Sequence, residues 1–296
     1  EADLLPRISK QKSSKVVIAE APEKNKISIK SDELRYFSDS KKTYLSKNVE
    51  LKKDDFIIKP TKGVDIDNEK NIAEIYDGFH MYSDTFKVTG NSMVIYIDDD
   101  KSDLGGPLIF EKIASKNVSD DLDEREKKLI QYTTRLSCDN AIYQELDGAH
   151  ILEVEGNILI EQKGKLISGD TGIYNQSNDS FKLNKNVAVE LENLDWLYDD
   201  NLKKKLKNED IKQSLNQQTY IQSNKLVYDG ELKKTVLLGD VIIKQSDKTI
   251  FADKVSLFDD SSEILCEGFL HIVSHSPFPI SDESNVAMSF HLHFYL

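Results

Sequence analysis

The chain has 296 residues, of which 39% are hydrophobic and 31% are charged, with a formal net charge of -13. This apolar content suffices for an ordered fold and excludes wholesale disorder. The acidic balance disfavours a nucleic-acid partner, and the sequence holds no run of 18 apolar residues that could span a bilayer as a helix.

Residues 1–25 form an N-terminal edge segment that is rich in Lys, Ser and Glu. Its one apolar run, Val16-Val17-Ile18, predicts a single edge strand. The chain starts at Glu1 rather than Met. We therefore expect either the removal of a signal peptide or a fragment of a longer chain.

A pattern of about 30 residues begins after this segment, and the stretch Ser31–Lys52 contains its first copy. With Asp32 as position zero, Asn48 lies at +16 and turn-forming residues lie between +4 and +11. Apolar and polar residues alternate on either side of Asn48 and of the turn-forming residues, which predicts short strands with one buried face. The inward positions are +2, +4, +11, +13, +17 and +19, occupied here by Leu34, Tyr36, Thr43, Leu45, Val49 and Leu51.

Seven copies of this pattern follow one another, with a period of 29 to 31 residues wherever no insertion intervenes. A single copy cannot bury its apolar face, whereas stacked copies can. The sequence therefore predicts an all-β, stacked-rung β-jellyroll, taco-like or solenoid-like, of about seven repeats. At about 4.8 Å per rung the body should be about 30 Å long or more. The copies start at Asp32, Lys62, Asn91, Asp139, Asp170, Asn224 and Asp253.

Two charged insertions interrupt the repeats, at about 111–132 and 193–217. Both follow position +19, so we expect solvated loops at one edge of the stack, with a lid or partner-binding element as the alternative. The second holds Trp196 and apolar residues near helical spacing. We assign residues 26–273 to the β-jellyroll and residues 274–296 to a C-terminal tail or capping strand.

Few residues suggest chemistry. His271 and His275, or His291 and His293, could share a strand face, but no Cys or acidic cluster completes a metal site, so ordinary strand histidines are favoured. The recurrent Asp or Asn at position zero predicts turn capping rather than catalysis. Cys138 and Cys266 fall several rungs apart, too far for a disulfide. We expect a protein that is not an enzyme and needs no cofactor.

The apolar interior has two possible meanings. Two closed sheets would make it a core, whereas splayed sheets would make it a lengthwise groove for a lipid or a partner. The repeat period alone does not separate these alternatives.

Three segments resemble the OstA/LptA family of lipopolysaccharide-transport proteins: 27–54, 152–175 and 222–258. The family's pattern around its turns is met at Gly156-Asn157-Ile158, Gly239-Asp240-Val241 and Ala252-Asp253-Lys254-Val255. The resemblance covers roughly residues 26–273, while the two insertions and the tail depart from it.

The resemblance implies a periplasmic β-jellyroll that binds lipopolysaccharide or a related lipid and passes its acyl chains along an apolar groove towards the outer membrane. Its implied partners are other OstA-fold transport proteins at open strand edges, or further copies of this chain end to end, and not nucleic acid. The lining carried over by position is Leu34, Tyr36, Val49, Leu51, Phe79, Met81, Ile158, Ile160, Val187, Val189, Val241 and Ile243.

Two rival hypotheses stay open at this point. The first is a structural or interaction protein of the same fold, with a closed core and end-to-end assembly. The second is a polysaccharide-acting enzyme built on stacked β-strands, for which the sequence singles out no pair of acidic residues.

Overall fold

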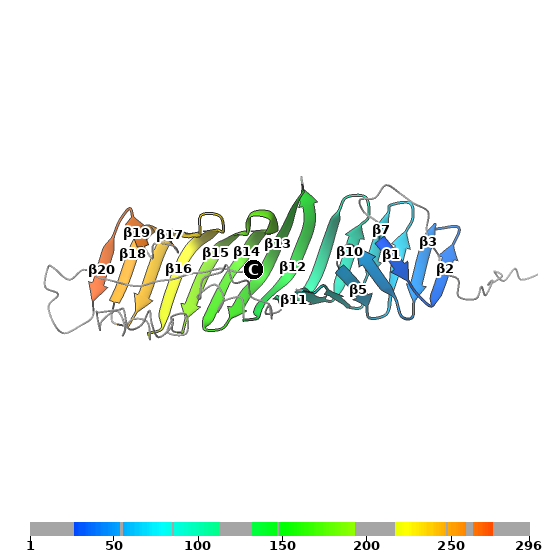
Figure 1. Cartoon of the computed structure of the whole chain (residues 1–296), viewed down its shortest axis with the longest axis horizontal. Helices are drawn as coiled ribbons and strands as arrows, with labels where there is room; N and C mark the ends of the chain where they lie inside the picture. Colours follow the sequence, from blue (N-terminus) through cyan, green and yellow to red (C-terminus); the bar gives the residue numbers. More distant parts are fainter. Residues whose placement is uncertain are drawn as a thin grey trace, which may run out of the picture.

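A computed structural model describes residues 27–53, 56–84, 86–112, 132–146, 148–192, 217–246, 248–258 and 263–274. These residues form an elongated body of β-strands (Figure 1). The predicted edge strand at Val16, the helical spacing in the second insertion and the capping strand of the tail all lie outside the described residues. Among the described residues, no helix has the length and apolar character needed to cross a membrane.

The strands of the N-terminal region are short, and those of the central region have 11 to 14 residues. The only helical element in the described part is a 3-10 turn, η1, at Gln176–Asn178. The short N-terminal strands are β1 (Ile27–Lys30), β2 (Glu33–Phe37), β3 (Lys42–Ser46), β4 (Glu50–Lys53), β5 (Phe56–Pro60), β6 (Gly63–Asp67), β7 (Ile72–Ile75), β8 (Phe79–Tyr82), β9 (Phe86–Gly90) and β10 (Ser92–Tyr96). The others are β11 (Lys101–Lys112), β12 (Thr134–Leu146), β13 (Ala149–Gln162), β14 (Lys165–Asn175), β15 (Ser180–Leu191), β16 (Thr219–Asp229), β17 (Lys234–Gln245), β18 (Lys248–Phe258), β19 (Glu263–Glu267) and β20 (His271–Ser274).

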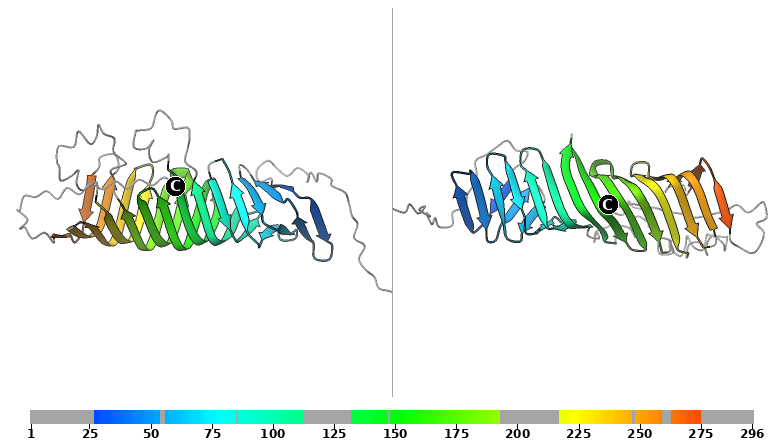
Figure 2. Two further views of the ribbon diagram at one scale, coloured as in Figure 1. Left: turned by 90° about the horizontal axis from the view of Figure 1, so that it is seen from below. Right: turned by 180° about the vertical axis from the view of Figure 1, so that it is seen from behind.

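The 20 strands of the described ranges all belong to one antiparallel sheet that is folded lengthwise into two leaves. Leaf I runs β2–β3–β6–β7–β10 and leaf II runs β1–β4–β5–β8–β9, before both continue into opposite halves of β11 to β18. At the far end, β19 extends leaf I and β20 extends leaf II. Two further views show the slanted strands stacked along the long axis (Figure 2). The fold is therefore the predicted all-β stack.

The line along which the sheet folds, here called the ridge, is marked by register shifts in the middle of the long strands. Such a shift separates Glu155 from Ile158, and another separates Leu238 from Val241. The residues in between have positive φ, for example 78° at Gly156 and 47° at Asn157. Bulges of this kind bend a strand and let it leave one leaf and enter the other.

The recurrent polar residues of the repeat close this ridge. Position zero and position +16 meet there, so that Asn157 Nδ2 donates to Asp139 at 2.8 Å. We call these contacts the ridge clasps. The others are Asn48 to Asp32 at 2.6 Å, Asn186 to Asp170 at 2.8 Å, Asn224 to Asp240 at 3.0 Å and the Phe269 amide to Asp253 at 2.8 Å. The prediction that the Asp/Asn residues at position zero cap a turn was wrong for the central repeats, because there they lie inside long strands and their side chains bond across the bend to the neighbouring strand.

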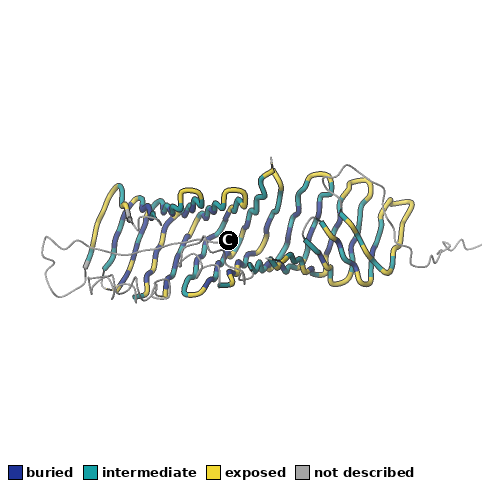
Figure 3. The backbone as a smooth tube through the Cα atoms, in the orientation of Figure 1, coloured by how far each residue is buried: buried dark blue, intermediate teal, exposed yellow. Residues whose placement is uncertain are grey.

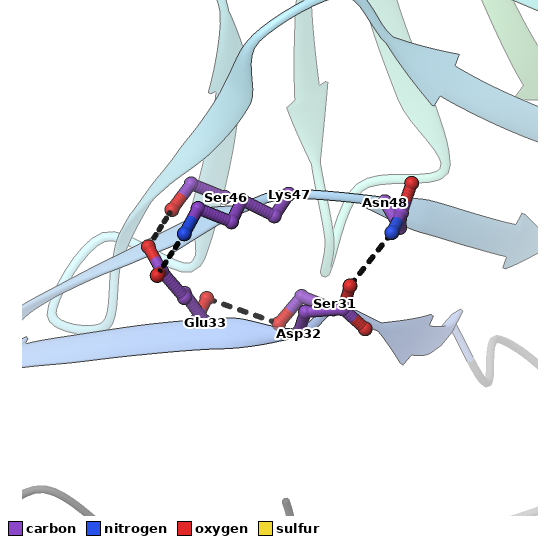
Figure 4. A network of polar contacts seen from close by, with 6 residues as sticks. All are labelled: Ser31, Asp32, Glu33, Ser46, Lys47 and Asn48. Carbon is purple, nitrogen blue, oxygen red and sulfur yellow. Dashed lines mark hydrogen bonds and ion pairs between the residues drawn. The ribbon is translucent and has the colours of Figure 1, made fainter.

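The opening stretch of the repeat holds three strands, the whole of β2 and β3 and most of β4, rather than the two expected. Its polar residues form a network at the ridge (Figure 4). The Glu33 carboxylate accepts hydrogen bonds from Lys47 Nζ and, at 3.3 Å, from Ser46 Oγ. The bond from Lys47 is the main reason why the pKa of Glu33 lies below its ordinary value.

The hydrophobic core fills the space between the leaves. Figure 3 shows burial concentrated along the strands and exposure at the turns. Val64, Leu183, Leu226 and Leu237 are fully buried, with 0% exposure. The continuous core cluster runs from Leu45 to Leu257, so the apolar residues of all seven repeats pack into one interior.

Opposite the ridge lies the mouth, where the hairpin turns of both leaves end. Each repeat contributes an outgoing and a returning strand to each leaf, for example β14 and β15 in the fifth repeat. The stack therefore grows by two strand spacings per repeat, roughly 9–10 Å. The assumption of one rung per repeat was wrong, so the body exceeds the predicted lower bound of about 30 Å.

The ends of the stack differ from its middle. Leu34 and Tyr36 of β2 are 54% and 58% exposed. At the other end, Leu270 is about half exposed, and Ile272 of β20 is 38% exposed. Among the described residues, apolar side chains are thus accessible where the stack has no further strand to cover them.

Candidate functional site

The candidate site is the space between the leaves, and most of the predicted lining lies there. Nine of the twelve predicted residues have exposed fractions of 6% or less. Met81 is half-buried and packs against the same cluster. Leu34 and Tyr36 share a face with Leu45 and Thr43, as their register requires, but they lie at the open end. The nine buried residues are Val49, Leu51, Phe79, Ile158, Ile160, Val187, Val189, Val241 and Ile243.

The predicted lining covers mainly leaf II and misses most of leaf I. Phe181, Leu226 and Leu237 are buried across the interior from the predicted residues. Tyr143, Tyr174 and Tyr228 occupy position +4 of their repeats and belong to the core or pack against it. The alternation of apolar residues at +2, +4, +11 and +13 already indicated that these leaf I side chains point inward.

A second missed feature is a row of lysines on the inner face of leaf II beside the mouth. We call Lys53, Lys112, Lys165 and Lys248 the rim lysines; all four are half-buried. Their inward placement follows from the register, because each pairs directly with a core or mouth residue across the ladder. The pairs are Lys53 with Phe56, Lys112 with Thr134, Lys165 with Leu191, and Lys248 with Gln245.

The first rim lysine reaches across the mouth to the other leaf. Lys53, at the end of β4, contacts Asp100 in the turn before β11, with 2.9 Å between Nζ and Oδ1. The two side chains are 19% and 23% exposed. This makes the pair less exposed than ion pairs between the hairpin turns, such as that between Lys41 and Glu69, which are 59% and 60% exposed.

The second rim lysine, Lys112, interacts electrostatically with a half-buried acid, Asp179. Tyr174 Oη donates to Asp179 Oδ1 at 3.1 Å. Burial raises the pKa of Asp179, while the hydrogen bond from Tyr174 and the charge of Lys112 act in the opposite direction. Burial also lowers the pKa of Lys112, against the attraction of Asp179. A cation of leaf II and an anion of leaf I therefore interact here too.

Between these lysines the mouth has neutral polar side chains. Gln162 Nε2 donates to Thr134 Oγ1 at 3.0 Å, and Gln245 Nε2 donates to Thr219 Oγ1 at 2.9 Å. All four side chains are buried. The space between the leaves thus has an apolar floor and a polar mouth.

A separate hollow of about 590 Å³ lies near the C-terminal end of leaf II. Ile242, Phe251 and Val273 line it from outward-facing positions of the register, and Phe269 stacks on His271 with the ring centroids 6.3 Å apart. The other histidines of the suggested metal pairs lie outside the described residues. Within the described part, no cluster of His, Cys, Asp and Glu could hold a metal ion.

The two cysteines are free thiols. Cys138 is buried in the core, and burial raises its pKa to about 12. The two cysteines lie on β12 and β19, several strands apart along the stack, as the repeat predicts.

The fold and the site define a class of protein: a two-leaved, stacked antiparallel β-jellyroll with an apolar interior. Residues 220–285 match the family described as LptA/(LptD N-terminal domain) LPS transport protein. The resemblance to the OstA/LptA family is thereby confirmed over less than a quarter of the chain, from β16 onwards.

Among solved structures, the chain is similar to LptH, the LptA-homologous periplasmic component of the lipopolysaccharide transport device from Pseudomonas aeruginosa. The identity is 14%, the TM-score is 0.35, and the match covers 48% of this chain and 95% of LptH. No curated protein sequence gives a match to the chain.

Proposed function

We propose that this protein is a periplasmic component of lipopolysaccharide transport that holds the acyl chains of its lipid between the two leaves. The observation that carries the proposal is the apolar inner face, which continues through all the repeats and ends in a polar mouth. The family match of residues 220–285 supports the same class of cargo.

The energetics suit a carrier. Each square ångström of apolar surface removed from water contributes about 25 cal/mol, so several acyl chains would be held firmly. The inner face carries few polar groups between the ridge and the mouth, so a bound chain could slide lengthwise without breaking hydrogen bonds.

The interior is filled by side chains in this structure, so a ligand requires the leaves to part. Backbone hydrogen bonds run along the stack within each leaf, so they stay intact when the two leaves separate. The ridge residues that would act as a hinge already have positive φ, as at Gly239 and Asp240. The main cost is the loss of side-chain packing, which acyl chains would replace with contacts of the same kind.

Photo-crosslinking in cells tests this proposal. A photoreactive amino acid at Val189 or Ile243 should give adducts with lipopolysaccharide, because both side chains are buried between the leaves. The matched controls are the outward-facing neighbours Ala188 and Ile242, which should give far fewer adducts. Equal labelling at inward and outward positions, or none at either, would contradict the proposal.

One observation favours a second candidate function. Leu51, Val64, Leu183 and Ile243 are fully buried without any ligand, as expected of a closed structural core. In that case the protein would act through assembly at the ends of its stack, where strand edges and apolar side chains are accessible. The absence of lipid adducts, together with concentration-dependent growth in light scattering, would favour this alternative.

The remaining predictions follow from the same proposal. Partners would be other OstA-fold transport proteins or further copies of this chain, joined through the open edges of β2 or β20. We expect no enzymatic activity and no cofactor. Transfer towards the outer membrane would need an energy source elsewhere, because the proposed site performs no chemistry.

A further inference from the structure

The rim lysines stand out against the composition of the protein. The chain has 52 acidic and 39 basic residues. Within the described strands, the register places lysine on the inner face at the mouth of leaf II only, at positions 53, 112, 165 and 248. An acyl chain forms no favourable interaction with an ammonium group. A phosphate at the end of an amphiphile forms a charge-assisted hydrogen bond with it.

The present partners of these lysines are exchangeable. Lys53 contacts one carboxylate oxygen of Asp100, and the pair keeps about a fifth of its surface exposed to water. A phosphate offers more acceptor oxygens and a larger charge than a carboxylate, so it can compete for the same ammonium group. Lys112 is attracted to Asp179, whose carboxylate also accepts the hydrogen bond of Tyr174.

We propose that the rim lysines bind the phosphate head group of an amphiphile whose acyl chains lie between the leaves, and that this head group displaces Asp100 from Lys53. This inference rests on the proposed function, because it needs acyl chains in the interior. It adds a charged head-group site on leaf II and an ion pair that keeps the mouth closed until such a head group arrives.

The spacing of the rim lysines fits stepwise passage. Along leaf II they lie four, three and four strands apart, on β4, β11, β14 and β18. With neighbouring strands about 4.8 Å apart, the steps are roughly 14–19 Å. Lys53 lies in the N-terminal region, where the inner face of β2 is accessible, so it would be the first of the four that a head group meets from that end.

Binding of two matched fluorescent probes to the full chain tests the site. The probes are lysophosphatidic acid and a monoacylglycerol with the same labelled acyl chain, both below their micelle concentration. Replacing all four rim lysines with Gln should weaken lysophosphatidic acid binding by at least about tenfold and leave monoacylglycerol binding within about twofold. The control replaces four outward-facing lysines, Lys52, Lys182, Lys225 and Lys244, and should change neither affinity.

The ion pair between Lys53 and Asp100 gives a second test, because replacing one partner or the other should change lysophosphatidic acid binding in opposite directions. Lys53→Gln should weaken lysophosphatidic acid binding about threefold or more, because a cation is lost. Asp100→Asn should strengthen it by a similar factor, because the competitor of the phosphate is lost. A purely structural ion pair would change binding in the same direction in both variants, and that result would overturn the proposed exchange.

The outcomes separate this inference from the proposed function. Loss of the phosphate preference only in the rim variant supports both. Binding of both probes with no effect of the rim variant overturns the head-group site and leaves the carrier function standing. Failure of the unmodified chain to bind either probe contradicts the carrier function itself. Displacement of lysophosphatidic acid by millimolar inorganic phosphate alone would assign the lysines to free phosphate rather than to a lipid, and would also overturn the inference.

Discussion

The N-terminal region, residues 27–96, and the central region, residues 101–258, build the same two leaves in different ways. In the N-terminal region separate short strands serve leaf I and leaf II, as β3 and β4 do. In the central region single strands cross the ridge through a bulge and serve both leaves, as β15 does. Both regions place left-handed residues at the ridge, such as Asn48 and Asn186. The bend is thus a property of the repeat, while the continuity of the strand is not.

The two regions also differ in burial at equivalent positions. Leu34 and Leu226 both occupy position +2 of their repeats, yet Leu34 is 54% exposed and Leu226 is 0% exposed. The difference comes from neighbours, because Leu226 lies between packed strands on both sides and Leu34 lies on the last strand of leaf I. Identical local sequence signals therefore produce a core residue in one place and an accessible one in the other.

The largest expected effect tests this pair of leucines. Leu226→Ala should lower the free energy of unfolding by about 2–5 kcal/mol, because it leaves a cavity in a packed interior. Leu34→Ala should cost less than about 1 kcal/mol, since half of its side chain is already in water. Chemical denaturation of the two variants measures both values. Equal losses of unfolding free energy in the two variants would show that Leu34 is as buried as Leu226, which would contradict the comparison.

The second prediction concerns the ridge clasps. Asn157 has a φ of 47° and donates to Asp139. Asn157→Ala should cost about 1–2 kcal/mol, because alanine is disfavoured in the left-handed region and the hydrogen bond is lost. Asn157→Gly, the control, keeps the backbone freedom and should recover part of the loss. Asn48→Ala, at the same position in the N-terminal region, should affect global unfolding less.

A smaller effect is expected at the ion pair that joins the two leaves across the mouth in the N-terminal region. Lys53→Gln should lower the stability by at most about 1 kcal/mol, because a partly exposed ion pair contributes little in water. Lys52→Gln, on the outer face beside it, should have no measurable effect. Thermal unfolding at low and high salt would check this, and an effect that persists in high salt would contradict the electrostatic interpretation.

The smallest effect should appear as a pH dependence in the central region. Burial raises the folded-state pKa of Asp179 above its ordinary value of 3.8, so the folded chain binds this proton more tightly than the unfolded chain. As the pH falls from the raised value towards 3.8, the native chain should gain stability relative to Asp179→Asn, and this gain should be lost again as the pH rises. A difference between the two proteins that does not change with pH would argue against a raised pKa of the Asp179 carboxylate.

Much of the interior could be predicted from the alternation of apolar residues. Val189 and Ile243 were placed inward correctly because period-two patterning leaves little choice of face once one residue is assigned. Tyr143 and Tyr174 were assigned to the inward position +4 but left out of the predicted lining, and the rim lysines were missed, although the alternation simply continues to them. Lysine near a strand end does not look like a lining residue until the opposing leaf is known.

The sequence by itself determined the repeat and the strand faces, because these depend on local alternation and on Asp and Asn at fixed positions. Only the tertiary structure decided that position zero and position +16 meet, that each repeat adds two strands to each leaf, and that Lys53 contacts Asp100 47 residues away. The physical reason is that these features depend on which strands become neighbours and on how the leaves close over one another. Local patterning fixes the face on which a residue lies but not the residue that it meets across the interior.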